Sequence, residues 1–195
     1  VSANERLNPL RLEQCFEHAP TTEQELAMRV FTEFLVCRNP HSMMLMRGSA
    51  GTGKSSLAGA FVRAMALLGQ KTVLMAPTGR AAKVFSLSGG HAAFTIHRKI
   101  YRLRAFAGVG GEYNLNDNLH ADTLFMVDEA SMVANGGGVE AAFGSGRLLD
   151  DLVRYVYSGR NCRLVLIGDQ AQLPPVGEEL SPALDTQFME GYGME

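Results

Sequence analysis

Four short runs of apolar residues divide the chain, at residues 43–46, 72–76, 124–127 and 164–167. Each run is apolar on successive positions, a pattern typical of strands that are buried on both faces of a parallel sheet. The stretches 56–68, 79–87, 95–104 and 147–158 lie between or beside these runs and have helix-compatible sequences. Strands that alternate with helices predict an α/β fold with a mostly parallel central sheet.

Two further helices are expected before the sheet, at about residues 5–17 and 22–37. The second is preceded by Thr21 and carries acidic residues in its first turn, as helix starts commonly do. Glycine-rich stretches at 89–90, 108–111 and 135–138 predict loops. A chain of 195 residues fits one such domain better than two.

Polar residues follow each predicted strand directly. The glycine-rich stretch from Gly48 follows the first run, residues 77–79 follow the second, 128–129 the third and 168–169 the fourth. Open α/β sheets bind their ligands at the carboxyl ends of their strands. The four clusters therefore predict a single site.

Residues 48–55 read GSAGTGKS, which is the phosphate-loop pattern. In such a loop, backbone N–H groups converge on phosphate oxygens and the following helix points its positive end at the same charge. We expect Lys54 to reach the β- and γ-phosphates of a nucleoside triphosphate and Ser55 to bind Mg²⁺. The predicted nucleotide contacts here are Ser49, Ala50, Gly51, Thr52, Gly53, Lys54, Ser55 and Ser56.

The acidic pair Asp128 and Glu129 follows the third predicted strand. In a phosphate-loop protein, Asp128 is the expected partner of the Mg²⁺ held by Ser55, and Glu129 would orient or deprotonate the attacking water. The pair predicts hydrolysis of the nucleotide. Lys54 and Glu129 are accordingly predicted to be catalytic.

Composition narrows the other possibilities. No apolar run approaches the roughly 18 residues of a membrane span, and no signal-peptide pattern opens the chain, so we expect a soluble cytoplasmic protein without a membrane partner. The three cysteines are far apart, and the five histidines lack metal-ligand spacing. Neither a disulfide framework nor a transition-metal site is predicted.

Charge is unevenly distributed, although the net charge is only -2. No Asp or Glu occurs between Phe34 and Gly111, a segment with eleven Lys and Arg residues. Its later part, residues 80–104, interleaves basic residues with Phe94, His97 and Tyr101, which suits single-stranded nucleic acid. The alternative is that these are solvated helix faces whose charges pair with acids elsewhere in the fold.

Five segments in order resemble superfamily 1 DNA helicases of the RecD-like group. They are GSAGTGKS (48–55), APTGRAAK (76–83), TIH (95–97), DEASM (128–132) and GDQAQLPPVG (168–177). The resemblance covers residues 21 to 176 or so. It implies a RecA-like, three-layer P-loop NTPase domain that binds ATP and Mg²⁺ and contacts single-stranded DNA, with short helices at its amino terminus.

The resemblance also implies roles for residues that pattern alone does not single out. Gln24 would contact adenine, and Gln172 would sense the γ-phosphate as a third catalytic residue. The implied DNA contacts are Thr78, Arg80, Thr95, His97, Pro174 and Pro175. Each has a simpler alternative: His97 as a partly buried histidine, Arg80 as a partner of an acid, and the two prolines as a stiff turn.

No segment resembles the family's second motor domain, which would supply an arginine to the ATP site. We therefore expect an amino-terminal helical segment (1–40) with the adenine-contacting motif, a RecA-like motor domain (41–180), and a tail (181–195) of a fragment. Alone, such a fragment would hydrolyse ATP poorly. The implied function is a motor that moves 5′ to 3′ on single-stranded DNA. The alternative is an ATP-gated nucleic-acid clamp or loader without unwinding activity.

Overall fold

The computed structural model describes residues 14–16, 19–104, 112–136 and 143–194. Its centre is a five-stranded sheet in which every pairing is parallel, with the strand order β1-β7-β6-β2-β3. The strands are β1 (Met43–Arg47), β2 (Lys71–Ala76), β3 (Ala93–Thr95), β6 (Thr123–Val127) and β7 (Arg163–Gly168).

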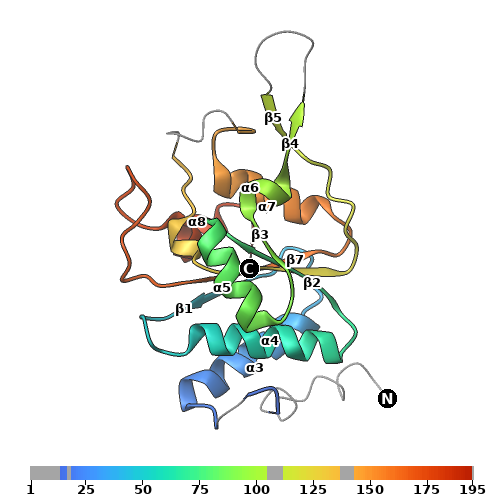
Figure 1. Cartoon of the computed structure of the whole chain (residues 1–195), viewed down its shortest axis with the longest axis vertical. Coiled ribbons are helices and arrows are strands. Elements are labelled where there is room, and N and C mark those ends of the chain that lie inside the picture. Colours follow the sequence, from blue (N-terminus) through green and yellow to red (C-terminus); the bar gives the residue numbers. More distant parts are fainter. Residues whose placement is uncertain (1–13, 17–18, 105–111, 137–142, 195) are drawn as a thin grey trace.

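Helices cover both faces of this sheet and make a three-layer domain (Figure 1). One face carries α3 (Thr22–Val36), α4 (Lys54–Leu67) and α5 (Gly79–Gly89). The other carries α6 (Ile96–Ile100), α7 (Leu148–Ser158), α8 (Thr186–Glu190) and the short 3-10 helices η1 (Ala130–Met132) and η3 (Pro182–Leu184).

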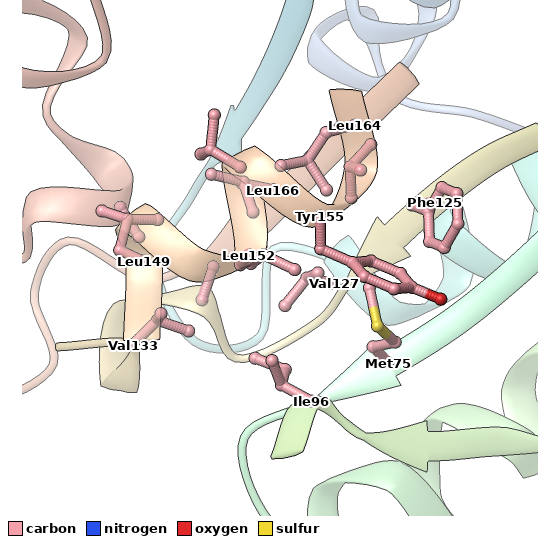
Figure 2. Close-up of a cluster of buried hydrophobic side chains, with 14 of the residues drawn as sticks. Met75, Ile96, Phe125, Val127, Val133, Leu149, Leu152, Tyr155, Leu164 and Leu166 are labelled. Carbon is pink, nitrogen blue, oxygen red and sulfur yellow. The ribbon is translucent and has the colours of Figure 1, made fainter. Parts of the chain in front are cut away.

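The consecutive apolar positions of the strands divide between two cores. Along β6, Leu124 and Met126 pack towards α3 and α4, whereas Phe125 and Val127 pack towards α7. Successive side chains of a strand point to opposite faces, so a sheet covered on both sides needs apolar residues at every position. Figure 2 shows the core beneath α7, where Phe125 and Val127 meet Leu149, Leu152 and Tyr155.

All four strands expected from the apolar runs are present, with ends shifted by one residue at most. The helices predicted at 22–37, 56–68, 79–87 and 147–158 correspond to α3, α4, α5 and α7. The helix predicted at 5–17 falls mainly outside the described residues, and Gln14 and Cys15 form a turn. Of the predicted loops, 108–111 and 137–138 also lie outside them.

The helix predicted at 95–104 is wrong over half of its length. Thr95 ends β3, α6 spans only 96–100, and β4 (Tyr101–Arg104) pairs antiparallel with β5 (Glu112–Leu115). Ile96 and Ile100, four positions apart, are both buried and account for the helical part. The β4–β5 hairpin projects beyond the layers of the domain (Figure 1).

The segment after residue 180 is packed against the domain. Its buried side chains Ala183, Leu184 and Met189 belong to the core beneath α7. Arg47, at the end of β1, donates hydrogen bonds to Leu184 O (3.3 Å) and Thr186 Oγ1 (3.2 Å). The first strand of the sheet is therefore tied to the end of the chain, which the sequence pattern did not indicate.

Helices α4 and α5 approach each other closely at Gly59. A Cβ at this position would lie 2.6 Å from Ser88 O, so only glycine allows the observed separation. Arg63, one turn further along α4, also donates to Ser88 O (3.3 Å). The two helices are thus joined near the end of α5 that lies farther from the polar edge of the sheet.

Within the described part of the chain, no helix combines the length and apolar character needed to cross a lipid bilayer.

Candidate functional site

The glycine-rich loop 48–53 joins the end of β1 to the start of α4. Gly51 and Gly53 have φ values of 78° and 80°, the left-handed region that side chains other than glycine rarely adopt. Helix α4 begins at Lys54, with Gly53 as an N-cap that has no side-chain hydrogen bond and no acidic residue in the first turn. The first N–H groups of the helix are therefore available to an anion.

Lys54 points back into this loop. Its Nζ donates to Gly48 O (2.6 Å) and Ser49 O (2.7 Å) and lies 3.8 Å from Asp169 Oδ2. The Lys54 side chain is only 17% exposed. The ammonium group is thus held at the mouth of the loop, between backbone carbonyls and a buried carboxylate.

Asp128 directly follows β6 at the same edge of the sheet and is 8% exposed. Its N–H donates to Met75 O (3.0 Å), which continues the pairing of β6 with β2, and its Oδ1 accepts from Glu129 N (2.9 Å). Burial raises the pKa of Asp128, and the charge of Glu129 adds to the rise, while the Glu129 N–H and the charge of Lys54 oppose it. Lys54 is therefore near enough to act electrostatically on Asp128.

The raised pKa of Asp128 predicts a pH-dependent stability difference for Asp128→Asn. The Asp128 carboxyl group binds its proton more tightly in the folded protein than in the unfolded chain. Its contribution to the free energy of unfolding is therefore most favourable below the ordinary pKa of 3.8 and is lost as the pH rises through the raised pKa. Asparagine carries no charge and can still accept from Glu129 N. Asp128→Asn should therefore be the more stable protein at neutral pH, with a difference that shrinks below pH 3.8.

Urea unfolding at a series of pH values measures this difference. Glu190→Gln, at an exposed carboxylate on α8, is the matched control and should track the parent protein. An Asp128→Asn protein that is less stable than the parent at neutral pH would contradict the prediction.

Glu129 adopts an uncommon backbone conformation. Its φ and ψ are 53° and 37°, left-handed for a residue with a side chain, and it caps the start of η1. Such conformations cost on the order of 1–3 kcal/mol and occur where the surrounding structure imposes them, frequently at functional sites. The half-buried Glu129 side chain follows Asp128 at the polar edge of the sheet.

Asp169 is a site residue to which the sequence analysis assigned no role. It is 3% exposed, faces Lys54 Nζ, and its Oδ1 accepts from Ala171 N (2.8 Å). Strand β7 lies between β1 and β6, and Gly168 pairs with Arg47 directly before the phosphate loop. The signal was present in the sequence as a carboxylate immediately after a buried strand, the same signal that identified Asp128.

Gln172 is connected to the segment that carries Glu129. Its Oε1 accepts from the hydroxyl of the fully buried Ser131 (2.9 Å). A second connection is made by Glu178 Oε1, which accepts from Asn135 N and Gly136 N at 2.7 Å each. The loop after β7 is thus fastened to the segment after β6 at two points.

Gln24 lies beside the phosphate loop. It forms a capping box with Thr21, in which Thr21 N donates to Gln24 Oε1 (2.9 Å) and Gln24 N donates to Thr21 Oγ1 (3.3 Å). Its Nε2 lies so close to Gly53 that a Cβ there would collide with it. Gln24 also lines a cleft of about 370 Å³ together with Ser55 and Ser56.

The residues implied to contact DNA fall into two groups. Thr78 and Thr95 cap α5 and α6 and accept from Ala81 N (3.2 Å) and Arg98 N (3.3 Å). They follow or end the paired strands β2 and β3, so they lie at one edge with Arg80, which is exposed. Pro174 and Pro175 belong to the separate loop after β7.

The aromatic residues of the basic segment are engaged within the protein. His97 is half-buried against Phe143, with ring centroids 4.9 Å apart, and burial lowers its pKa. Tyr101 is buried and donates to Asp151 Oδ2 (2.7 Å), so its ring is not an exposed stacking surface. Lys99 Nζ lies 5.3 Å from the centre of the Phe94 ring.

The basic side chains differ in their pairing. Arg102 lies 3.8 Å from Asp117, as the alternative of pairing with acids predicts. Arg80 forms no ion pair within the described residues.

The donor set suits Mg²⁺ bound together with a nucleotide. Mg²⁺ is usually held by one or two carboxylates, phosphate oxygens and water, rather than by a cage of protein ligands. The site offers the Ser55 hydroxyl and the buried carboxylate of Asp128, and no group of three or more His, Cys, Asp or Glu side chains gathers among the described residues.

A glycine-rich loop between strand and helix, buried carboxylates directly after two further parallel strands, and a sheet covered on both faces define a RecA-like P-loop NTPase domain. Residues 21–184 match the family described as AAA domain, and the chain belongs to it. The similarity of its motifs to RecD-like superfamily 1 helicase motor domains is confirmed by a relative in Deinococcus radiodurans.

That relative, an ATP-dependent RecD2 DNA helicase, is 33% identical over 136 residues, which are 70% of this chain and 16% of the relative. A protein of Methanocaldococcus jannaschii is 32% identical over 171 residues, 80% of this chain and 13% of that protein. The chain therefore spans less than a fifth of the length of these relatives.

Two solved structures are also similar. Bacteroides Pif1 bound to ssDNA matches 91% of this chain and 36% of its own, with 20% identity and a TM-score of 0.49. The Pif1 helicase from Candida albicans matches 89% and 38%, with 22% identity and the same TM-score.

Proposed function

We propose that the chain is the amino-terminal motor domain of a DNA helicase, which binds ATP with Mg²⁺, hydrolyses it and moves 5′ to 3′ along single-stranded DNA. The supporting observation is the convergence of Lys54 with Asp128 and Asp169, the buried carboxylates that directly follow β6 and β7. These groups lie on the segments that follow the adjacent strands β1, β7 and β6, and they meet at the mouth of a glycine-rich loop.

Binding of ATP would require Lys54 Nζ to exchange its contacts with Gly48 O and Ser49 O for oxygens of the β- and γ-phosphates. The uncapped N–H groups at the start of α4 would donate to the same phosphates. Ser55 and Asp128 would hold Mg²⁺, which would supply positive charge to offset the negative charge that develops on the phosphates. Asp169 keeps the ammonium group oriented while it exchanges partners.

Glu129 would accept a proton from, or orient, the water that attacks the γ-phosphorus. Its left-handed backbone turns the chain sharply after Asp128, so two successive carboxylates can take different roles. Gln172 would report the γ-phosphate through its hydrogen bond with Ser131, two residues beyond Glu129. A change at the nucleotide would then reach the loop that carries Pro174 and Pro175.

Efficient hydrolysis would need an arginine from a second motor domain. An arginine supplied from outside typically accelerates phosphoryl transfer by about 10³ to 10⁵. The chain covers 16% and 13% of two relatives, so a further domain of the same polypeptide is the proposed source. Without it, we expect ATP binding with slow turnover.

Arg80→Ala provides the test of the DNA-binding part of the proposal. Arg80 is exposed at the edge formed by β2 and β3 and forms no ion pair within the described residues, so its charge is available to a phosphate. Arg80→Ala should weaken binding to an oligothymidylate strand and lower the salt dependence by about one phosphate contact. Fluorescence anisotropy over a range of salt concentrations measures both.

Arg160→Ala is the matched control, because Arg160 is exposed near the start of β7, away from the carboxyl edge. Equal affinity and salt slope for Arg80→Ala and the parent would remove this residue from the DNA site. If single-stranded DNA did not change the rate of ATP hydrolysis by the natural protein, a different ATP-driven function would be favoured.

A further inference from the structure

A cleft of about 370 Å³ opens beside the first turn of α4. Its lining comes from four parts of the chain: the turn before α3, the start of α3, α4 and the end of α5. The lining residues are Phe16, Ala19, Gln24, Ser55, Ser56, Arg63 and Ser88. Ser55 and Ser56 immediately follow Lys54, so a nucleotide with its phosphates in the loop has this cleft next to its ribose and base. The volume is within the range of small-molecule sites.

Arg63 joins three of the elements that form the cleft. From α4, its Nε and Nη2 both donate to Cys15 O, at 3.0 and 2.8 Å, and its Nη1 donates to Ser88 O at 3.3 Å. The planar guanidinium group can make this forked contact, which a lysine ammonium group would not reproduce. Ser88 O belongs to the last turn of α5, where carbonyls lack partners within the helix.

The residue that this contact positions is Phe16. It follows Cys15 directly, packs against the core of α3 and α4, and lines the cleft. Residues 14–16 form no helix or strand, so the two hydrogen bonds from Arg63 to Cys15 O supply a restraint that regular backbone pairing would otherwise provide. Phe16 is the aromatic residue in the lining, and aromatic side chains provide a face on which bases stack.

We infer that Arg63 is a positioning residue for the base of the bound nucleotide: it fixes the turn 14–16 so that Phe16 forms a wall of the base cleft. This inference rests on the proposed function, since it requires the triphosphate to lie in the loop 48–55. It assigns the phosphates and the base of the nucleotide to different parts of the chain. The phosphates are held by Lys54 and the start of α4, and the base depends on the turn that Arg63 holds.

The contributions of the base and of the phosphates to affinity can be measured by comparing ATP with inorganic tripolyphosphate, which has no base or ribose. Both are titrated in the presence of Mg²⁺ by isothermal calorimetry into the parent chain, Arg63→Ala, Phe16→Leu and Lys54→Ala. Arg63→Ala and Phe16→Leu should weaken ATP about tenfold and leave tripolyphosphate unchanged, a loss typical for one base–aromatic stack. Lys54→Ala should weaken both ligands.

Arg160→Ala is the matched arginine control and should bind both ligands as the parent does, because its 3.8 Å ion pair with Asp122 is remote from the cleft. Thermal unfolding verifies that each variant folds. If Arg63→Ala does not fold, Phe16→Leu carries the test, because leucine retains the apolar packing and removes only the ring.

The outcomes distinguish the two levels of the argument. A parent chain that binds neither ligand, or a Lys54→Ala variant that binds both normally, overturns the proposed function and this inference with it. The inference alone is overturned if Lys54→Ala weakens both ligands as expected, but Phe16→Leu and Arg63→Ala keep the parent's ratio of ATP to tripolyphosphate affinity.

Discussion

Replacing Lys54 by alanine is expected to weaken ATP binding by on the order of 10² to 10⁴-fold, because two charge-assisted hydrogen bonds to phosphate would be lost. The ammonium group already lies at the mouth of the phosphate loop, where it donates to Gly48 O and Ser49 O, and the substitution removes no apolar side chain from either core. The substitution should therefore leave the fold intact. Calorimetry with ATP and Mg²⁺, together with a thermal unfolding curve, measures both parts of the prediction.

The structure adds a consequence for stability. Lys54→Ala leaves the buried Asp169 without its cationic neighbour at 3.8 Å, and a buried carboxylate without an opposite charge is destabilising even though Ala171 N still donates to it. The double variant Lys54→Ala with Asp169→Asn removes this charge and should recover stability without recovering ATP affinity. If Lys54→Ala bound ATP as tightly as the parent, the assignment of the loop would be wrong.

Glu129→Gln should lower the rate of ATP hydrolysis by about 10² to 10⁴, the usual contribution of a positioned acid or base, with little change in ATP affinity. The amide is nearly isosteric and cannot accept the proton from water. Steady-state hydrolysis in the natural protein with single-stranded DNA measures the rate, and calorimetry measures the affinity. Lost ATP binding would indicate a structural role for Glu129 instead.

A second substitution at the same position separates backbone from side chain. At φ 53° and ψ 37°, glycine is not strained, so Glu129→Gly should relieve part of the conformational cost that glutamate bears. The glycine protein should be at least as stable as Glu129→Ala, which keeps the strain, while both lack hydrolysis. A glycine variant less stable than the alanine variant would show that the left-handed backbone does not strain this residue.

The strands of the central sheet were predictable from sequence because burial on both faces leaves an uninterrupted apolar run. β3 was not, since its three residues are half-buried at the sheet edge and continue directly into α6. In β4, Tyr101 is buried while Arg102 and Leu103 are both exposed, so burial does not alternate along this strand and gives no strand signal. The helical spacing of Ile96 and Ile100 favoured a helix that continued into this stretch, whereas Tyr101–Arg104 pairs antiparallel with β5, the next strand along the chain.

At the site, sequence predicted which groups would gather but not how they contact one another. The apolar runs place Lys54 and Asp128 at one edge, because parallel strands all end there. The order of the strands depends on packing of the whole chain, so the position of β7 next to β1, and with it the approach of Asp169 to Lys54, could not be predicted. The link from Arg63 to Cys15 likewise depends on tertiary structure, as 48 residues separate them.

The close approach of α4 and α5 at Gly59 has a mechanical consequence. Because no side chain separates them at Gly59 and Arg63 donates a hydrogen bond from α4 to α5, the two helices should move together as one rigid unit. Helix α4 begins at Lys54, and Thr78 and Arg80 lie at the start of α5. A shift of α4 on binding of nucleotide phosphates would therefore also shift the start of α5. The proposed nucleotide and DNA sites would then be coupled through this one helical layer.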